Sequence, residues 1–146
     1  MVHPREARHL GRMRVTMLSA FLFLSGSLGA AIGAALLLVP VSFEASAGIN
    51  LPVDPSLLSE LRAPGGALLA LGALTVAGAF LPRLAPTSLL VATLVYLSYG
   101  VSRAVGLLFD GPPSGSIVLA MIAELAVGII GLWLLGRGGR SVLKAV

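Results

Sequence analysis

The sequence contains no cysteine and only two histidines, His3 and His9, both in the polar N-terminal segment. The absence of cysteine excludes disulfides, thiolate metal ligands and thiol nucleophiles. Because neither histidine lies in an apolar segment, no histidine can ligate a metal or a haem inside the apolar part of the chain. We therefore expect no metal site and no cofactor.

Charged residues are also scarce. Only 11% of the 146 residues are charged, whereas 57% are hydrophobic, and the mean hydropathy is +1.00. A soluble domain has about a quarter of its residues charged. Because so few polar side chains cannot cover a water-facing surface, the composition predicts an integral membrane protein surrounded by membrane lipids.

The net charge of +4 does not indicate nucleic-acid binding. The basic residues lie in short flanks of the apolar segments, and no basic face with interleaved aromatic residues is present. Basic flanks of this kind orient membrane helices and contact lipid head groups. We therefore expect no nucleic-acid partner.

Four apolar stretches are each long enough to cross a bilayer, which takes about 20 helical residues. Their expected bounds are residues 15–39, 61–81, 87–108 and 116–135. In lipid the backbone must satisfy its own hydrogen bonds, so each stretch is expected to be a helix. The predicted fold class is an all-α integral membrane protein with a four-transmembrane-helix up-down bundle. This membrane domain, 15–136, lies between basic tails at 1–14 and 137–146.

The first span is expected to stay in the protein, because 25 apolar residues exceed the 7–15 of a signal-peptide core. The loop after it is the only long connection in the sequence. Residue Pro55 favours a short helix there, with Asp54 as its N-cap.

The charges outside the spans predict the orientation of the helices. Both tails are basic, and Arg83 lies in the short loop between the second and third spans. The other two loops contain Glu44, Asp54 and Asp110 but no lysine or arginine. Because positive flanks stay in the cytoplasm, both termini are expected to be cytoplasmic.

Three charged residues, Arg62, Arg103 and Glu124, lie inside the apolar spans. A charge near the bilayer centre costs about 2.5–3.5 kcal/mol, so such residues usually face the interior of the bundle. At the rise of an α-helix, Glu124 is about 12–14 Å below the outer face and Arg103 about 8 Å. Glu60 and Asp110 mark the outer rim, so all five charges fall in the outer half.

Small or polar residues follow one face of every span, and this pattern is typical of contacts between membrane helices. In the last three spans the same face carries the charge, so we expect the charges to converge. The candidate site residues are Glu60, Arg62, Gly65, Gly66, Tyr96, Tyr99, Arg103, Asp110 and Glu124.

Two interpretations of this cluster remain open. In the first, Glu124 neutralises Arg103 or Arg62, and the charges only fix the packing of the helices. In the second, the two arginines outnumber Glu124 and bind an anion or a lipid head group in a pocket open to the outer side. The GxxxG pair Gly29 and Gly33 is expected to seat one helix of the bundle on another, although a homo-oligomer is the alternative.

Three motifs resemble a known family. They are "ELRAPGG" at the start of the second span, "YGVSRAVGLLFDGPP" at the end of the third and "AEL" in the fourth. Together they resemble the bacterial four-helix membrane family labelled domain of unknown function 4345. The resemblance maps onto Glu60, Arg62, Gly65 and Gly66, then Arg103, Asp110 and Gly111, then Glu124. It implies a multi-pass protein of the bacterial cytoplasmic (inner) membrane and no particular activity.

The expected function is that of a non-enzymatic membrane protein. It would bind a lipid or a small anionic or apolar ligand at the polar cluster, or support a larger membrane complex. The alternative is a small membrane enzyme or a proton-coupled carrier that uses Glu124 as its acid or base.

Overall fold

The computed structural model describes the backbone of residues 4–142 and the side chains of residues 16–137. His3 and Lys144 lie outside the described residues. The described chain forms five helices and no strand: α1 (Pro4–Leu38), α2 (Pro40–Ser46), α3 (Pro55–Phe80), α4 (Ala85–Phe109) and α5 (Gly115–Val142). Four of them contain segments long and apolar enough to cross a membrane, namely Thr16–Leu38, Pro55–Phe80, Ala85–Phe109 and Gly115–Arg137. The predicted all-α class with four membrane spans is confirmed.

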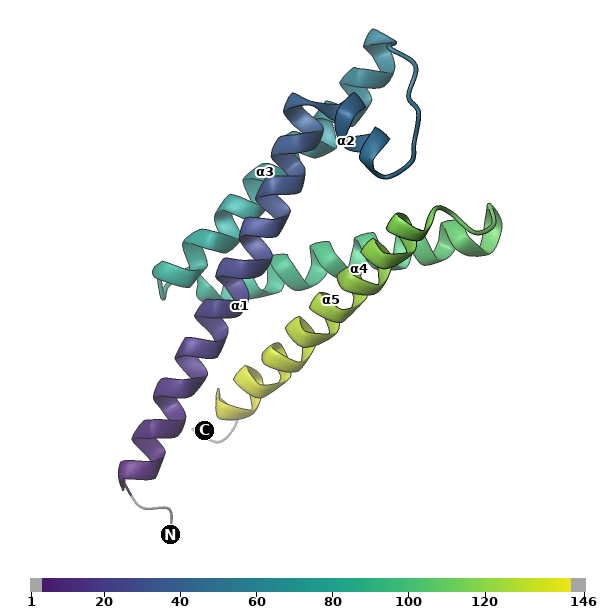
Figure 1. Cartoon of the computed structure of the whole chain (residues 1–146). Helices are drawn as coiled ribbons and strands as arrows, with labels where there is room; N and C mark the ends of the chain where they lie inside the picture. The colour runs from purple at the N-terminus through teal and green to yellow at the C-terminus, as the bar shows by residue number, and fades with distance from the viewer. Residues whose placement is uncertain (1–3, 143–146) are drawn as a thin grey trace.

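The four long helices are arranged as two antiparallel pairs. Helix α1 lies along α3, and α5 lies along α4, while α3 also packs against α4 beside the short turn that joins them (Figure 1). Helix α2 and the loop after it lie at the end of the molecule remote from both termini (Figure 1). We call this end the loop end, and the opposite one the terminal end.

Pairs of glycines bring α1 and α3 into backbone contact. A Cβ atom on Gly26 would lie 2.9 Å from the carbonyl oxygen of Gly72, and one on Gly33 would lie 2.7 Å from that of Gly65. In each helix the two glycines are seven residues apart, or about two turns, so both contacts fall on one seam. Gly33 of the GxxxG pair therefore seats α1 on α3, as the sequence predicts.

The second pair of helices packs glycine against leucine. A Cβ on Gly100 of α4 would meet Leu125 of α5 at 2.7 Å, and one on Gly128 of α5 would meet Leu97 of α4 at 2.5 Å. The two pairs are joined at the terminal end, where Ser88 fits against Gly78 and its hydroxyl donates to the Leu74 carbonyl at 2.8 Å. Each helix contact thus depends on a residue without a bulky side chain.

Apart from Ser88, the buried serine and threonine side chains among the described residues form hydrogen bonds within their own helices. The hydroxyls of Ser25, Thr75 and Thr93 each donate to the carbonyl four residues earlier, at 2.6, 2.8 and 2.7 Å. In contrast, many large apolar side chains are exposed, among them Leu24, Phe80 and Leu119. An apolar outer surface around an interior whose polar groups are hydrogen-bonded is the arrangement expected in lipid.

The loop end differs in detail from the sequence-based expectation. Asp54 is an N-cap, and its carboxylate accepts from the Leu57 amide at 2.9 Å, but the helix that begins there continues directly into the span as α3. Pro64 consequently lies in the interior of α3 and not in its first turn. Helix α2 was not predicted, because seven residues are too few to show a helical period.

Two neighbouring glycines provide a matched test of the α1–α3 contact. A Cβ on Gly65 would lie 2.8 Å from the Leu37 amide nitrogen and 3.0 Å from the Gly33 carbonyl oxygen, whereas one on Gly66 has no neighbour within 4 Å. We expect Gly65→Ala to lower the free energy of unfolding by about 1–3 kcal/mol, as overpacking does. Gly66→Ala should keep it or raise it by up to about 1 kcal/mol. Denaturation of the purified variants in detergent measures both, and an equal effect would contradict the glycine seam.

Candidate functional site

A cavity of about 540 Å³ lies between the two helix pairs at the loop end. All five helices contribute to its wall, and most of the lining side chains are apolar. Representative apolar residues of the wall are Leu28, Ile32, Leu68, Val95 and Val127. The cavity exists because α4 and α5 diverge from α1 and α3 toward the loop end, as Figure 1 shows.

One ion pair lies in the cavity wall. The Nε of Arg103 on α4 donates to both carboxylate oxygens of Glu124 on α5, at 3.0 and 3.2 Å. The carboxylate side chain is 14% exposed and the guanidinium side chain 35%. Of the two partners that the sequence allowed for Glu124, Arg62 and Arg103, the structure therefore shows Arg103.

Arg62 does not join this pair. It is exposed on α3, and its guanidinium donates to the carbonyl of Leu37 in the last turn of α1. The last carbonyls of a helix have no partner in that helix, and positive charge is favourable there. Arg62 thus caps α1, and the expectation that it turns inward toward Arg103 and Glu124 is wrong.

The other rim residues also lie outside the cavity wall. Glu60 is exposed on α3, and Asp110 is exposed at the C-cap of α4. Of the two glycines after Arg62, Gly65 packs against α1 and Gly66 has open space beside it. The structure therefore divides the predicted cluster into separate groups.

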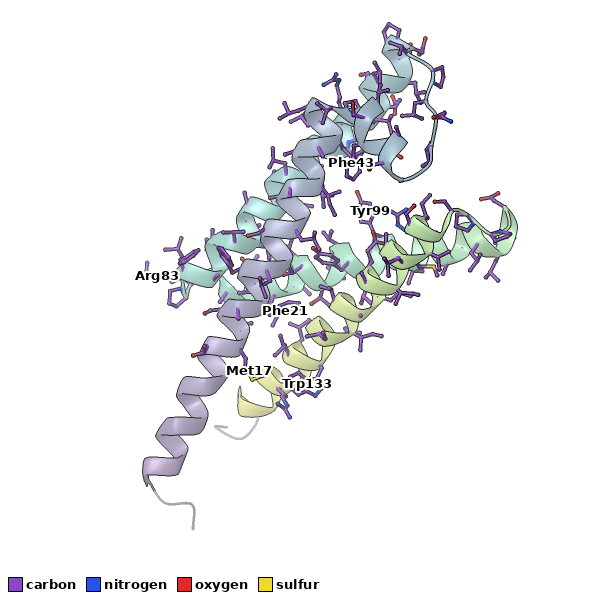
Figure 2. All side chains as sticks on the ribbon, in the orientation of Figure 1. Met17, Phe21, Phe43, Arg83, Tyr99 and Trp133 are labelled. Atoms are coloured by element: carbon purple, nitrogen blue, oxygen red, sulfur yellow. The ribbon has the colours of Figure 1, made fainter. Side chains whose placement is uncertain are left out.

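Both tyrosines line the cavity. Tyr96 is buried, and its hydroxyl donates to the Ser25 carbonyl of α1 at 2.7 Å, a bond that ties α4 to α1. Tyr99 is half-buried one turn nearer the loop end. In Figure 2, Tyr99 and Phe43 of α2 lie on facing sides of the space between the helix pairs.

The sequence-based list missed the part of the wall that comes from α2 and the residues after it. Phe43, Glu44, Ala47 and Ile49 all line the cavity. Their only signal in the sequence is Glu44, the one acidic residue of an otherwise uncharged stretch, and its charge indicates the orientation of the helices and not a position in a cavity wall. Nothing in the sequence brings this loop to the mouth of the cavity.

Two serines hold the α2 segment against α5. The hydroxyls of Ser114 and Ser116 donate to the carbonyl of Ala47 at 2.8 and 3.0 Å. The neighbouring Gly48 has a φ of +86°, a backbone conformation that glycine adopts without strain, and this turns the chain after α2. The α2 segment therefore bridges the two helix pairs at the loop end.

The charge balance of the wall differs from the expected one. Its charged residues are Glu44, Arg103 and Glu124, which are two acidic residues and one basic residue. The expected surplus of positive charge is wrong, because Arg62 lies outside and Glu44 lies inside. Within the part of the chain whose side chains are described, no cluster of three metal-binding side chains occurs.

The Arg103–Glu124 pair can be tested with a double-mutant cycle. Glu124→Ala leaves a half-buried guanidinium without its partner and should destabilise the protein, whereas adding Arg103→Ala should recover part of the loss. We expect a coupling energy of about 1–2 kcal/mol between the two sites, as for residues in direct contact. Glu60→Ala, which removes an exposed carboxylate, serves as the control. Strict additivity in denaturation would contradict the pair.

Comparison with known proteins agrees with the motifs found in the sequence. No curated protein and no solved structure matches the chain. A family model described as Domain of unknown function (DUF4345) matches residues 17–135, which include both residues of the ion pair and all of the four apolar segments except Thr16, Gly136 and Arg137. The chain therefore belongs to the DUF4345 family.

Proposed function

We propose that this integral membrane protein binds a lipid or a small apolar molecule in the cavity between its two helix pairs. The observation that carries the proposal is the cavity itself, with a volume of about 540 Å³ and a mostly apolar wall. Binding sites for small molecules are typically clefts of about 300–1,000 Å³ with a few polar groups in an apolar lining. The ion pair, Glu44 and the tyrosines are the polar groups here.

The packing of the helices supports binding as the role of this space. Elsewhere the helices approach one another until glycine is the only residue that fits, as at Gly33 and Gly72. Protein interiors are normally packed without large voids. Because these helices pack closely elsewhere, the cavity is not explained by a general looseness of the helix packing. The ion pair then keeps two opposite charges neutral beside an apolar ligand.

A second candidate is a membrane enzyme or a proton-coupled carrier that works through Glu124. Its support is the position of the Glu124 carboxylate, which lines the cavity and is not fully buried. However, both oxygens of this carboxylate contact Arg103, so the side chain already has a partner. Ligand binding is therefore the better-supported proposal, and support of a larger membrane complex is the third candidate.

We further propose that the protein resides in the bacterial cytoplasmic membrane with both termini in the cytoplasm. This proposal rests on the basic tails and Arg83 at the terminal end and on the acidic residues at the loop end. It places α2 and the mouth of the cavity on the outer side.

The orientation can be tested with single cysteines, since the chain has none of its own. Val53, which is 80% exposed at the loop end, and Pro82, exposed in the α3–α4 turn, are suitable positions. We expect Val53→Cys to react with a membrane-impermeant maleimide in intact cells, and Pro82→Cys only after permeabilisation. The reverse pattern would invert the proposed orientation.

The binding proposal can be tested by filling the cavity. Ala120 lines the cavity, whereas Ala126 on the same helix is exposed outside it. Native mass spectrometry of the detergent-purified protein should show a retained lipid or apolar molecule in the wild type and in Ala126→Phe. Ala120→Phe should lose most of this adduct.

Three other results would contradict the binding proposal. An unliganded wild type would remove its basis, and a co-purifying protein without a small ligand would favour the role in a membrane complex. Proton-coupled flux in liposomes that disappears in Glu124→Gln would favour the carrier. Comparable denaturation curves for the two phenylalanine variants would show that loss of the adduct is not loss of fold.

A further inference from the structure

Glu44 is the charge in the cavity wall that no described side chain neutralises. Among the side chains described, within residues 16–137, no basic group lies within ion-pair distance of its carboxylate, whereas Glu124 is held by Arg103. Arg62, the other arginine near the loop end, donates to Leu37 and is outside the wall. The cavity therefore has a formal surplus of one negative charge, located on α2 at its mouth.

Aromatic rings surround the same part of the cavity. Phe43, next to Glu44 on α2, and Tyr99 on α4 lie on facing sides of the space (Figure 2). Tyr96, three residues before Tyr99 on α4, is buried and also lines the cavity. The chain has only two tyrosines, and both are in this wall. Aromatic faces attract ammonium groups, most strongly where water is partly excluded, and aromatic cages recognise quaternary ammonium ligands.

From these two observations we infer that the ligand of the cavity is an amphipathic molecule with an ammonium head group. The head group lies at the mouth, between the Glu44 carboxylate and the rings of Phe43 and Tyr99. The inference rests on the proposed function and adds the chemical class of the ligand to it. The ammonium group belongs either to a lipid head group or to a free hydrophobic amine or quaternary ammonium compound.

The wall beyond the mouth fits the apolar body of such a molecule. Leu28, Leu68 and Val127 line the part nearer the middle of the helices, and the Arg103–Glu124 pair on the α4–α5 side is neutral as a unit. The α2 segment that carries Phe43 and Glu44 is fixed to α5 through the two hydroxyl bonds to Ala47. The head-group site is thus built from both helix pairs and from the segment that bridges them.

An anionic head group meets the opposite situation. Glu124 already occupies the Nε of Arg103 and cancels the charge of its guanidinium. An anion at the mouth would face the Glu44 carboxylate, and like charges repel over distances of several ångströms where water is partly excluded. The same wall therefore discriminates between ligands that differ only in the sign of their head group.

A competition among three amphiphiles with the same chain tests the inference. Purified protein is mixed with equal concentrations of decyltrimethylammonium, decanol and decanoate, and bound ligand is counted by native mass spectrometry. We expect the cation to exceed the anion by about tenfold, as one opposite charge at short range allows. Glu44→Gln should reduce this ratio to within about threefold, and Phe43→Ala should also lower it.

The controls separate the ligand class from the existence of a site. Glu60→Gln removes an exposed carboxylate outside the cavity and should leave the ratio unchanged, while Ala120→Phe should abolish binding of all three compounds. Equal binding of the three, or preference for decanoate, would overturn the inference and leave the proposed function standing. No binding of any of them, and no retained lipid, would overturn both.

A second competition distinguishes the two sources of the ammonium group. Retention of lysophosphatidylethanolamine over lysophosphatidylglycerol, lost in Glu44→Gln, would support the inference and assign the ammonium to a lipid head group. A preference seen only with decyltrimethylammonium would support it and assign a free hydrophobic cation. If Glu44→Gln and Glu60→Gln change either preference equally, Glu44 does not select the ligand, and the inference fails.

Discussion

The backbone contact between α1 and α3 is the constraint on which the rest of the structure depends. In lipid the hydrophobic effect does not drive helices together, so association relies on close packing and on contacts between backbones. Gly26 against Gly72 and Gly33 against Gly65 allow that approach along two turns. This contact makes α1 and α3 one unit, to which Arg62 adds a cap on the end of α1. The second pair, α4 and α5, is attached through Ser88 at the terminal end and diverges from there.

The charged residues of the membrane part have three different roles in this arrangement. Arg62 satisfies the end of a helix, whereas Arg103 and Glu124 neutralise each other in a mostly apolar wall. Glu44 reaches the same wall from a short helix outside the long ones. Charges that a hydropathy profile treats alike therefore differ in their surroundings, and among the described wall residues Glu44 is the charge without an ion-pair partner.

The parts of this structure that depend on local chemistry could be predicted from the sequence. The number of spans follows from the length and apolarity of the four segments. The contact of Gly33 with α3 follows from small residues at helical spacing, and the pairing of Glu124 follows from the cost of an isolated charge in lipid. The direction of Arg62 could not be predicted, because a long, flexible side chain near the end of a span can reach either the bundle or a carbonyl of a neighbouring helix. The cavity and Glu44 were missed because they depend on the angle between helix pairs and on the path of a loop, and neither leaves a periodic pattern.

Pro64 has a consequence for where the water boundary lies on α3. Proline has no amide hydrogen, so the Glu60 carbonyl, four residues earlier in the helix, lacks its usual donor. In hydrocarbon an unsatisfied carbonyl would cost several kcal/mol, whereas at the membrane surface water or a lipid head group can donate to it. The length of α3 leads to the same level: 26 residues span about 39 Å, roughly 9 Å more than a bilayer core, which corresponds to about six residues. With Phe80 at the opposite face of the core, this excess would place the first turns of α3, from Pro55 to Glu60, above the hydrocarbon, next to Leu61 and Pro64 of the cavity wall.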